Sequence, residues 1–110
     1  MNIPVRPVEP KPAPAKPDPA YLDAVRALPC CIGEAFGGGC EGPVAAHHTI
    51  CGRYGQHRTP DRQAIPLCWA HHQGPLGIHS DKHSWQQEYG PDTDYISATL
   101  ERLMRQVGAA

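Results

Sequence analysis

Apolar side chains recur at helical spacing near both ends of the chain. The first series follows Asp18-Pro19, a typical helix start, and is stopped by Pro29; its members are Tyr21, Leu22, Val25 and Leu28. The second series starts after about Thr93 and runs to Gly108, a typical helix stop; its members are Ile96, Leu100, Leu103 and Val107. Glu101 and Arg105 are spaced to pair on another face of this last helix.

The middle of the chain reads as two short strands with loops around them. Residues 44–48 form the first predicted strand, and residues 64–67 form the second, in which Pro66 restricts the strand to an edge or an end of a sheet. Residues 30–42 and 51–60 contain glycines at turn-like spacing and are predicted as loops. A short helix is expected from Cys68 to about Gly74. A further helix, capped by Ser80 or Asp81, is expected to end near Tyr89. The pattern therefore predicts an α+β fold.

Composition separates an arm from a small domain. Seven prolines fall within residues 1–19, which predicts a proline-rich, disordered arm, and leaves residues 20–110 as the folded domain. The chain has one Phe, two Met and two Trp, so its hydrophobic core is thin. Domains of this size usually need a disulfide or a metal to support the core.

Cysteine and histidine content favours a metal. The chain has five cysteines and seven histidines, and the arm contains no apolar run of the kind that a signal peptide requires. A cytoplasmic location is therefore expected, with no membrane association, and thiols in that compartment are more often ligands than disulfides. A structural zinc is predicted at Cys68 and His71, with Cys40 and either Cys30 or Cys31; Cys30 is preferred. Buried cysteines without a metal are the simpler alternative, and redox chemistry at Cys30-Cys31 lacks a C-x-x-C motif.

Two histidine doublets suggest a second metal. Neighbouring side chains on a strand point to opposite sides, so His47 and His48 are expected to have different roles. Neighbouring side chains on a helix also diverge, which separates His72 from His71. The strand doublet, His72 and the later His79 can then enclose an ion with open coordination positions, as catalytic metals have.

These motifs resemble a known family of nucleases. Ala46-His47-His48, followed by Leu67-Cys68-x-x-His71-His72, resembles the ββα-metal fold of HNH endonucleases, also called the His-Me finger. The similarity is greatest to phage recombination-enhancement nucleases, which depend on RecA, and to related phage HNH proteins. Gly52-Arg53 and Glu88-Tyr89-Gly90 also fit that branch, and the resemblance covers roughly residues 29–90.

The resemblance implies a metal-dependent endonuclease that hydrolyses phosphodiester bonds in DNA, in phage recombination or DNA processing. His47, His72 and His79 would hold a catalytic Zn²⁺, Mn²⁺ or Mg²⁺, and His48 would be the general base. A host RecA-type recombinase filament would be a partner. The only asparagine is Asn2, so the middle Asn of the family name has no counterpart; Asp61 is the candidate to replace it in pinning the loop between the strands.

Charge leaves a second interpretation open. The net charge of -1 and the pI of about 6.6 are unlike those of proteins that coat nucleic acid. Arg53 and Arg58 nevertheless lie between the doublets and are candidates for phosphate binding. The alternative function is a non-catalytic, zinc-stapled module that binds DNA or protein, in which every bound metal is closed to water.

Overall fold

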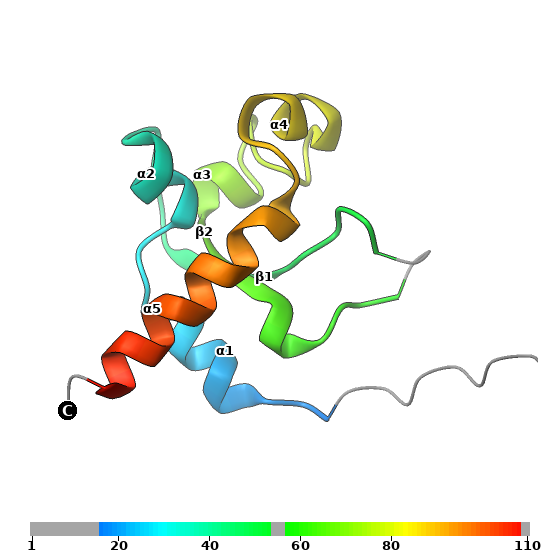
Figure 1. Ribbon diagram of the computed structural model, residues 1–110. Coiled ribbons are helices and arrows are strands. Elements are labelled where there is room, and N and C mark those ends of the chain that lie inside the picture. The colour runs from blue at the N-terminus through cyan, green and yellow to red at the C-terminus, as the bar shows by residue number, and fades with distance from the viewer. Residues whose placement is uncertain (1–15, 54–56, 109–110) are drawn as a thin grey trace, which may run out of the picture.

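The computed structural model describes residues 16–53 and 57–108 as a small α+β domain (Figure 1). The elements, in chain order, are α1 (Pro19–Arg26), α2 (Cys31–Phe36), β1 (Val44–His48), the 3-10 turn η1 (Asp61–Gln63), β2 (Ala64–Cys68), α3 (Trp69–His72), α4 (Lys82–Tyr89), the 3-10 turn η2 (Asp92–Tyr95) and α5 (Ile96–Gly108). The predicted arm lies mostly outside the described residues. The chain is already anchored at Asp18, whose amide donates to Asp61 Oδ2 at 2.8 Å.

The two strands pair antiparallel and form the centre of the domain. Val44 lies opposite Cys68 and His48 lies opposite Ala64. All five residues of β2 are buried, because α1, α2, α3 and α5 all contact this strand. Figure 1 shows α5 crossing the sheet, with α4 at the end of the domain that also carries α3. Pro66 lies in β2, and its place in a two-stranded sheet agrees with the predicted restriction to an edge.

The core is small and lies between β2 and the helices that cover it. Its largest fully buried side chains include Ile32, Ile65, Leu67, Ile78 and Trp85. The indole Nε1 of Trp85 donates to the backbone carbonyl of His71 at 3.1 Å, which satisfies the polar edge of a buried aromatic ring. The core therefore holds α4 against α3. Helix α3 carries His71 and His72, one predicted ligand for each of the two metal ions.

The helix starts follow their capping residues. The Asp18 side chain accepts from the Tyr21 amide, and the Asp81 side chain accepts from the Ser84 amide, as the sequence predicted. Glu101 and Arg105 form the predicted ion pair at 2.6 Å. The last helix begins at Ile96 rather than Thr93, because Asp92 turns into the core within η2. The side chain of Val107 lies outside the described part of the chain.

One predicted loop is wrong in part. Residues 30–42 were expected to be a loop throughout, but Cys31–Phe36 form α2. Ile32 is fully buried on this helix, so a single apolar anchor stabilises a short turn that periodicity does not reveal. Gly37 ends the helix in the left-handed conformation, with φ of 79°. The glycine run begins only where the helix stops.

Among the described helices, none is long and apolar enough to cross a membrane.

Candidate metal centres

Three cysteines and one histidine converge between α2, β2 and α3. The group, called the cysteine cluster below, consists of Cys30, Cys40, Cys68 and His71, whose ligand atoms all lie within 4.8 Å of one another. Cys30 precedes α2, Cys40 follows the glycine run, Cys68 ends β2, and His71 lies on α3. The sequence predicted this set, with Cys30 preferred over Cys31. Cys31 lies outside it.

The spacing of the donors fits a tetrahedral metal ion. The Nδ1 atom of His71 lies 3.5 Å from Cys30 Sγ, 3.8 Å from Cys40 Sγ and 3.1 Å from Cys68 Sγ. Sulfur and nitrogen ligands at ordinary zinc bond lengths and a tetrahedral angle are about 3.6 Å apart. The cluster could therefore hold a metal ion such as zinc without a large rearrangement of its side chains.

A glycine gives the Cys40 sulfur room to enter the cluster. A Cβ atom at Gly33 would lie 2.4 Å from Cys40 Sγ, closer than the two atoms can approach. Burial lowers the pKa of His71, so its imidazole is neutral and its lone pair is available to a metal. Desolvation and the neighbouring Cys30 raise the pKa of Cys40 to about 12. The pKa of Cys68 is lowered: burial alone would raise it, but backbone hydrogen bonds at His71 and Glu41 outweigh that effect.

Three histidines form a second group on the other side of α3. This three-histidine cluster consists of His47 from β1, His72 from α3 and His79 from the segment before α4. The ring centroids are 5.0 Å apart for His47 and His72, 5.2 Å for His47 and His79, and 4.7 Å for His72 and His79. The Nε2 atoms of His72 and His79 are 3.1 Å apart. Two imidazole ligands of one zinc ion are separated by about 3.3 Å, so this pair also has the spacing of ligands.

A tight turn returns His79 to His72. The amide of His79 donates to the carbonyl of His72 at 3.1 Å, and the amide of Ile78 donates to the carbonyl of His71 at 3.0 Å. A Cβ atom at Gly77 would lie 2.6 Å from the His72 carbonyl, so the turn requires glycine there. The Gly74-Pro75-Leu76-Gly77 segment is thus the element that closes the cluster.

Desolvation keeps two imidazoles of this cluster, those of His72 and His79, neutral. Desolvation, with the nearby His47 and His79, lowers the pKa of His72 to about 4. Desolvation, followed by His47 and Arg53, also lowers the pKa of His79. Neutral imidazoles carry the lone pairs that metal ions require.

Sequence reasoning missed a buried carboxylate beside this cluster. Asp92 is 0% exposed and accepts three hydrogen bonds: from His47 Nε2 at 2.9 Å, from the Ile50 amide at 2.7 Å and from the Cys51 amide at 3.0 Å. Burial alone would raise the pKa of Asp92, but these hydrogen bonds hold it below its ordinary value. The sequence gives no local signal that separates Asp92 from the nearby Asp94.

This finding corrects the expectation for Asp61. In the described part of the loop between the strands, the backbone amides at Ile50 and Cys51 are held by Asp92 and not by Asp61. Asp61 instead lies 2.8 Å from His48 Nε2 through Oδ1, and its other oxygen accepts from the Asp18 amide. The Asp18 amide and then His48 lower the pKa of Asp61. The carboxylate is therefore ionised and can accept a hydrogen bond from His48.

His48 points away from His47, as expected for neighbours on a strand. Its side chain is 18% exposed, and Arg58 Nη2 lies 3.0 Å from the same Nε2 atom that faces Asp61. One ring nitrogen cannot both donate to a carboxylate and accept from a guanidinium, so the two contacts are alternatives. Arg53 is exposed next to residues 54–56, which the structure does not describe, and Arg62 pairs with Asp18 at 3.2 Å.

A cleft of about 420 Å³ adjoins Asp61 and Arg58, the two residues that contact His48. It is lined by Pro17, Pro19, Leu22, Arg58, Thr59, Pro60 and Asp61.

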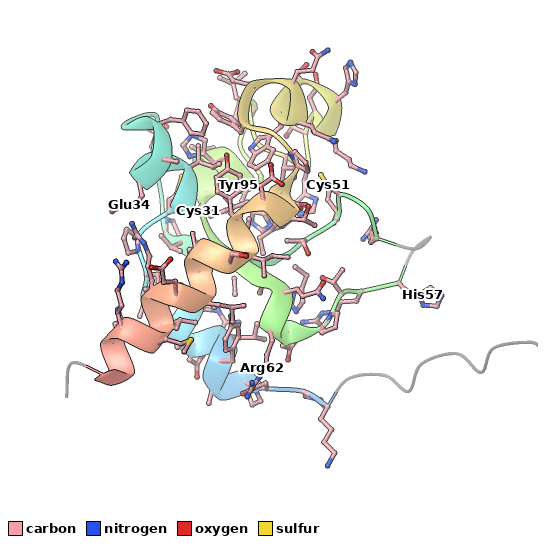
Figure 2. The ribbon with its side chains drawn as sticks, in the orientation of Figure 1. Cys31, Glu34, Cys51, His57, Arg62 and Tyr95 are labelled. Carbon is pink, nitrogen blue, oxygen red and sulfur yellow. The ribbon has the colours of Figure 1, made fainter. Side chains whose placement is uncertain are left out.

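In Figure 2, His57 lies at the outer edge of the loop between the strands. His57 and His83 are both exposed, and neither belongs to a cluster of donors among the described residues.

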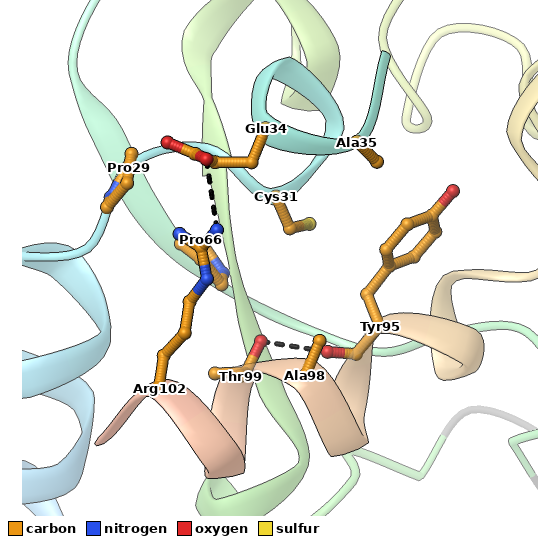
Figure 3. Close-up of a pocket in the computed structure, with 9 residues that line it drawn as sticks. All are labelled: Pro29, Cys31, Glu34, Ala35, Pro66, Tyr95, Ala98, Thr99 and Arg102. Atoms are coloured by element: carbon orange, nitrogen blue, oxygen red, sulfur yellow. Dashed lines mark hydrogen bonds and ion pairs between the residues drawn. The ribbon is translucent and has the colours of Figure 1, made fainter. Parts of the chain in front are cut away.

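A smaller cleft of about 160 Å³ lies between α2 and α5 (Figure 3). Cys31 and Tyr95 line it, and Arg102 pairs with Glu34 at 3.0 Å. Burial, together with the neighbouring Cys30, raises the pKa of the Cys31 thiol to about 12. A thiol with this pKa is protonated and unreactive, which argues against redox chemistry at Cys30-Cys31.

The fold and the two clusters define a small α+β protein with candidate metal sites. The chain belongs to the family described as a protein of unknown function (DUF968), whose model matches residues 8–107. No curated protein matches the chain. No solved structure matches it either.

Proposed function

We propose that this protein is a metal-dependent DNA endonuclease of the HNH, or ββα-metal, type. The observation that carries the proposal is the convergence of His47, His72 and His79 at the end of the sheet where His48 also lies. Consecutive β1, β2 and α3 supply the first two of these ligands, in the element order that gives the ββα fold its name. The cysteine cluster supports the same proposal, because a structural zinc there would fix α3.

The two clusters would hold different ions. Four donors fill a tetrahedral shell, so zinc in the cysteine cluster would be closed to water. Three imidazoles leave at least one position open, and nitrogen donors favour Zn²⁺ or Mn²⁺ over Mg²⁺, which prefers oxygen. When bound, this second ion would supply positive charge at a phosphate oxygen and at the departing 3′ oxygen.

His48 is the proposed general base. Because the Asp61 carboxylate can only accept, their contact places the His48 proton on Nε2 and leaves the lone pair on Nδ1. That nitrogen can take a proton from the attacking water at neutral pH. Asp61 therefore fixes the tautomer and the orientation of the base.

Two arginines are proposed to bind the DNA backbone. The side chain of Arg58 is 69% exposed, and its guanidinium lies beside the His48 ring. When His48 donates to Asp61, the Arg58 guanidinium can bind a phosphate through charge-assisted hydrogen bonds. Arg53 is exposed on the same loop. From the resemblance to RecA-dependent nucleases, a RecA-type recombinase filament is the proposed partner that presents the DNA.

The test is cleavage of supercoiled plasmid and single-stranded DNA with Zn²⁺, Mn²⁺ or Mg²⁺, with and without a RecA-type filament. His48→Ala is expected to reduce cutting by about 10²–10⁴-fold, because it removes the general base, and to leave metal content unchanged. Asp61→Asn is expected to reduce cutting less. His57→Ala is the matched control, since it removes an exposed histidine from the same loop.

Failure of the parent protein to cut under every condition would contradict the proposal. A parent that binds DNA or protein without cutting, and that holds all its metal closed to water, would instead be the zinc-stapled binding module.

A further inference from the structure

The segment after α4 supplies a carboxylate to the three-histidine cluster. We propose that Asp92 is a positioning residue that orients His47 as a metal ligand and fixes which of its nitrogens faces the metal. The proposal rests on the proposed function only in taking the three-histidine cluster as a metal site. It adds a residue from η2, outside the β1-β2-α3 unit.

The hydrogen bond determines the tautomer of His47. An ionised carboxylate accepts and does not donate, so the His47 Nε2 atom, 2.9 Å from Asp92 Oδ2, must carry the proton. The lone pair is then on Nδ1, which becomes the donor atom of His47 in the cluster. Histidine ligands of metals commonly donate their other N–H to a carboxylate, which orients the ring and raises its basicity.

The carboxylate is itself held in place on both oxygens. Oδ2 accepts from His47 and from the Ile50 amide, and Oδ1 accepts from the Cys51 amide. Because both oxygens are engaged and the residue is 0% exposed, Asp92 cannot rotate without losing a buried hydrogen bond. The same residue thus fixes the His47 ring and the loop that leads from His48.

The ionised state of Asp92 follows from these contacts. The Ile50 amide donates to Oδ2 and the Cys51 amide donates to Oδ1, and two such backbone donors favour the ionised carboxylate. Removal of Asp92 would leave these two amides and the His47 ring without their acceptor, and two of the three contacts are buried.

The first experiment measures zinc binding to the three-histidine cluster by calorimetry, with the cysteine cluster already loaded. Asp92→Asn is expected to weaken this binding about 10–100-fold, the usual cost of losing such a partner of a metal ligand. Asp94→Asn is the matched control, because Asp94 is an exposed carboxylate in the same turn. The control is expected to bind zinc as the parent does.

A double-mutant cycle separates positioning from general destabilisation. In a His47→Ala background, Asp92→Asn is expected to cause no further loss of zinc affinity, because the residue through which it acts is gone. An equal loss in both backgrounds would show that Asp92 is only structural and would overturn the proposal. Unchanged affinity in Asp92→Asn itself would also overturn it.

A second measurement needs no variant, no DNA and no second ion. The ¹⁵N chemical shifts of His47 in the parent protein report which ring nitrogen is protonated. Protonation at Nε2 is expected; protonation at Nδ1 alone would overturn the proposal even if Asp92→Asn does not fold. Absence of DNA cleavage would count against the nuclease proposal and would leave this result standing.

Discussion

The cysteine cluster and the three-histidine cluster lie on the two sides of α3 and differ in donor number and in exposure. The cysteine cluster has four donors: Cys30, Cys68 and His71 are at most 4% exposed, and Cys40 is exposed. The three-histidine cluster has three donors, whose burial decreases from His47, which is buried, through His72 to His79, which is exposed. Three of the four donors are buried in the cysteine cluster, which is called the enclosed group below, whereas only one of three is buried in the three-histidine cluster, which is called the open group.

The difference shows that ligand type alone does not define the role of a metal site. Both clusters use imidazole, and both have donor spacings that suit a tetrahedral ion. The enclosed group connects β2, α2 and α3, and so supports a thin core. The open group has three donors, one fewer than a tetrahedral ion takes. Three changes can test this contrast, in order of decreasing effect.

The largest effect is expected from Cys30→Ala, which removes one donor from the enclosed group. Structural zinc contributes about 10 kcal/mol or more in small zinc domains, as much as the whole stability of many domains. The variant should therefore lose cooperative thermal unfolding, measured by circular dichroism, together with bound metal, measured by elemental analysis. Cys31→Ala is the matched control and should cost about 1–2 kcal/mol. The reverse ranking would assign Cys31 as the ligand.

A smaller effect is expected from Gly33→Ala, which leaves all four donors present. The new Cβ would lie 2.4 Å from Cys40 Sγ, so the sulfur must move and zinc affinity should fall by at least 10-fold, equivalent to about 1.4 kcal/mol. Competition with a chromophoric chelator measures this affinity. At Gly38, a Cβ would meet nothing within 4 Å, so Gly38→Ala is the control. Equal affinity in both variants would show that Cys40 is not held at the cluster.

The smallest effect concerns protons released on metal binding at pH 7. Since the pKa of His72 is lowered to about 4, its imidazole is already neutral and should release no proton. Since the pKa of Cys40 is raised to about 12, its thiol is protonated and must release one. Calorimetry in buffers of different ionisation enthalpy should therefore show more protons released at the cysteine cluster than at the three-histidine cluster.

Acidification toward pH 4 should abolish metal binding at the three-histidine cluster as His72 becomes charged. Equal proton release from the two clusters at pH 7 would contradict the states of His72 and Cys40.

The residues alone were sufficient to predict the strands and the cysteine cluster, whereas the choice of His47 over His48 for the second cluster came from the family resemblance. The alternation of side chains along a strand predicted different roles for His47 and His48, and the rotation per residue of a helix predicted different roles for His71 and His72. Both rules could be applied to the sequence because they depend only on local backbone geometry. The helix caps at Asp18 and Asp81 are equally local, because each side chain bonds an amide three residues later.

The features that escaped prediction depend on contacts between distant segments. Asp92 bonds Ile50 across 42 positions of the chain, and no local pattern indicates which loop an isolated aspartate will meet. Asp61 was assigned to the loop for its position between the strands, whereas its actual partners are His48 and Asp18. Helix α2 was missed because one buried isoleucine, Ile32, anchors it. The preference for Cys30 over Cys31, by contrast, was made from the sequence, and Cys30 lies in the cluster.

The adjacency of His71 and His72 fixes the distance between the two clusters. One peptide bond joins the residues, and α3 turns their rings to opposite sides of the same short rod. Repacking of the surrounding helices can alter the shape of either group but cannot move the groups far apart. The covalent structure therefore sets the separation of the two clusters, and any thermal distortion of α3 would move a ligand of each cluster at the same time.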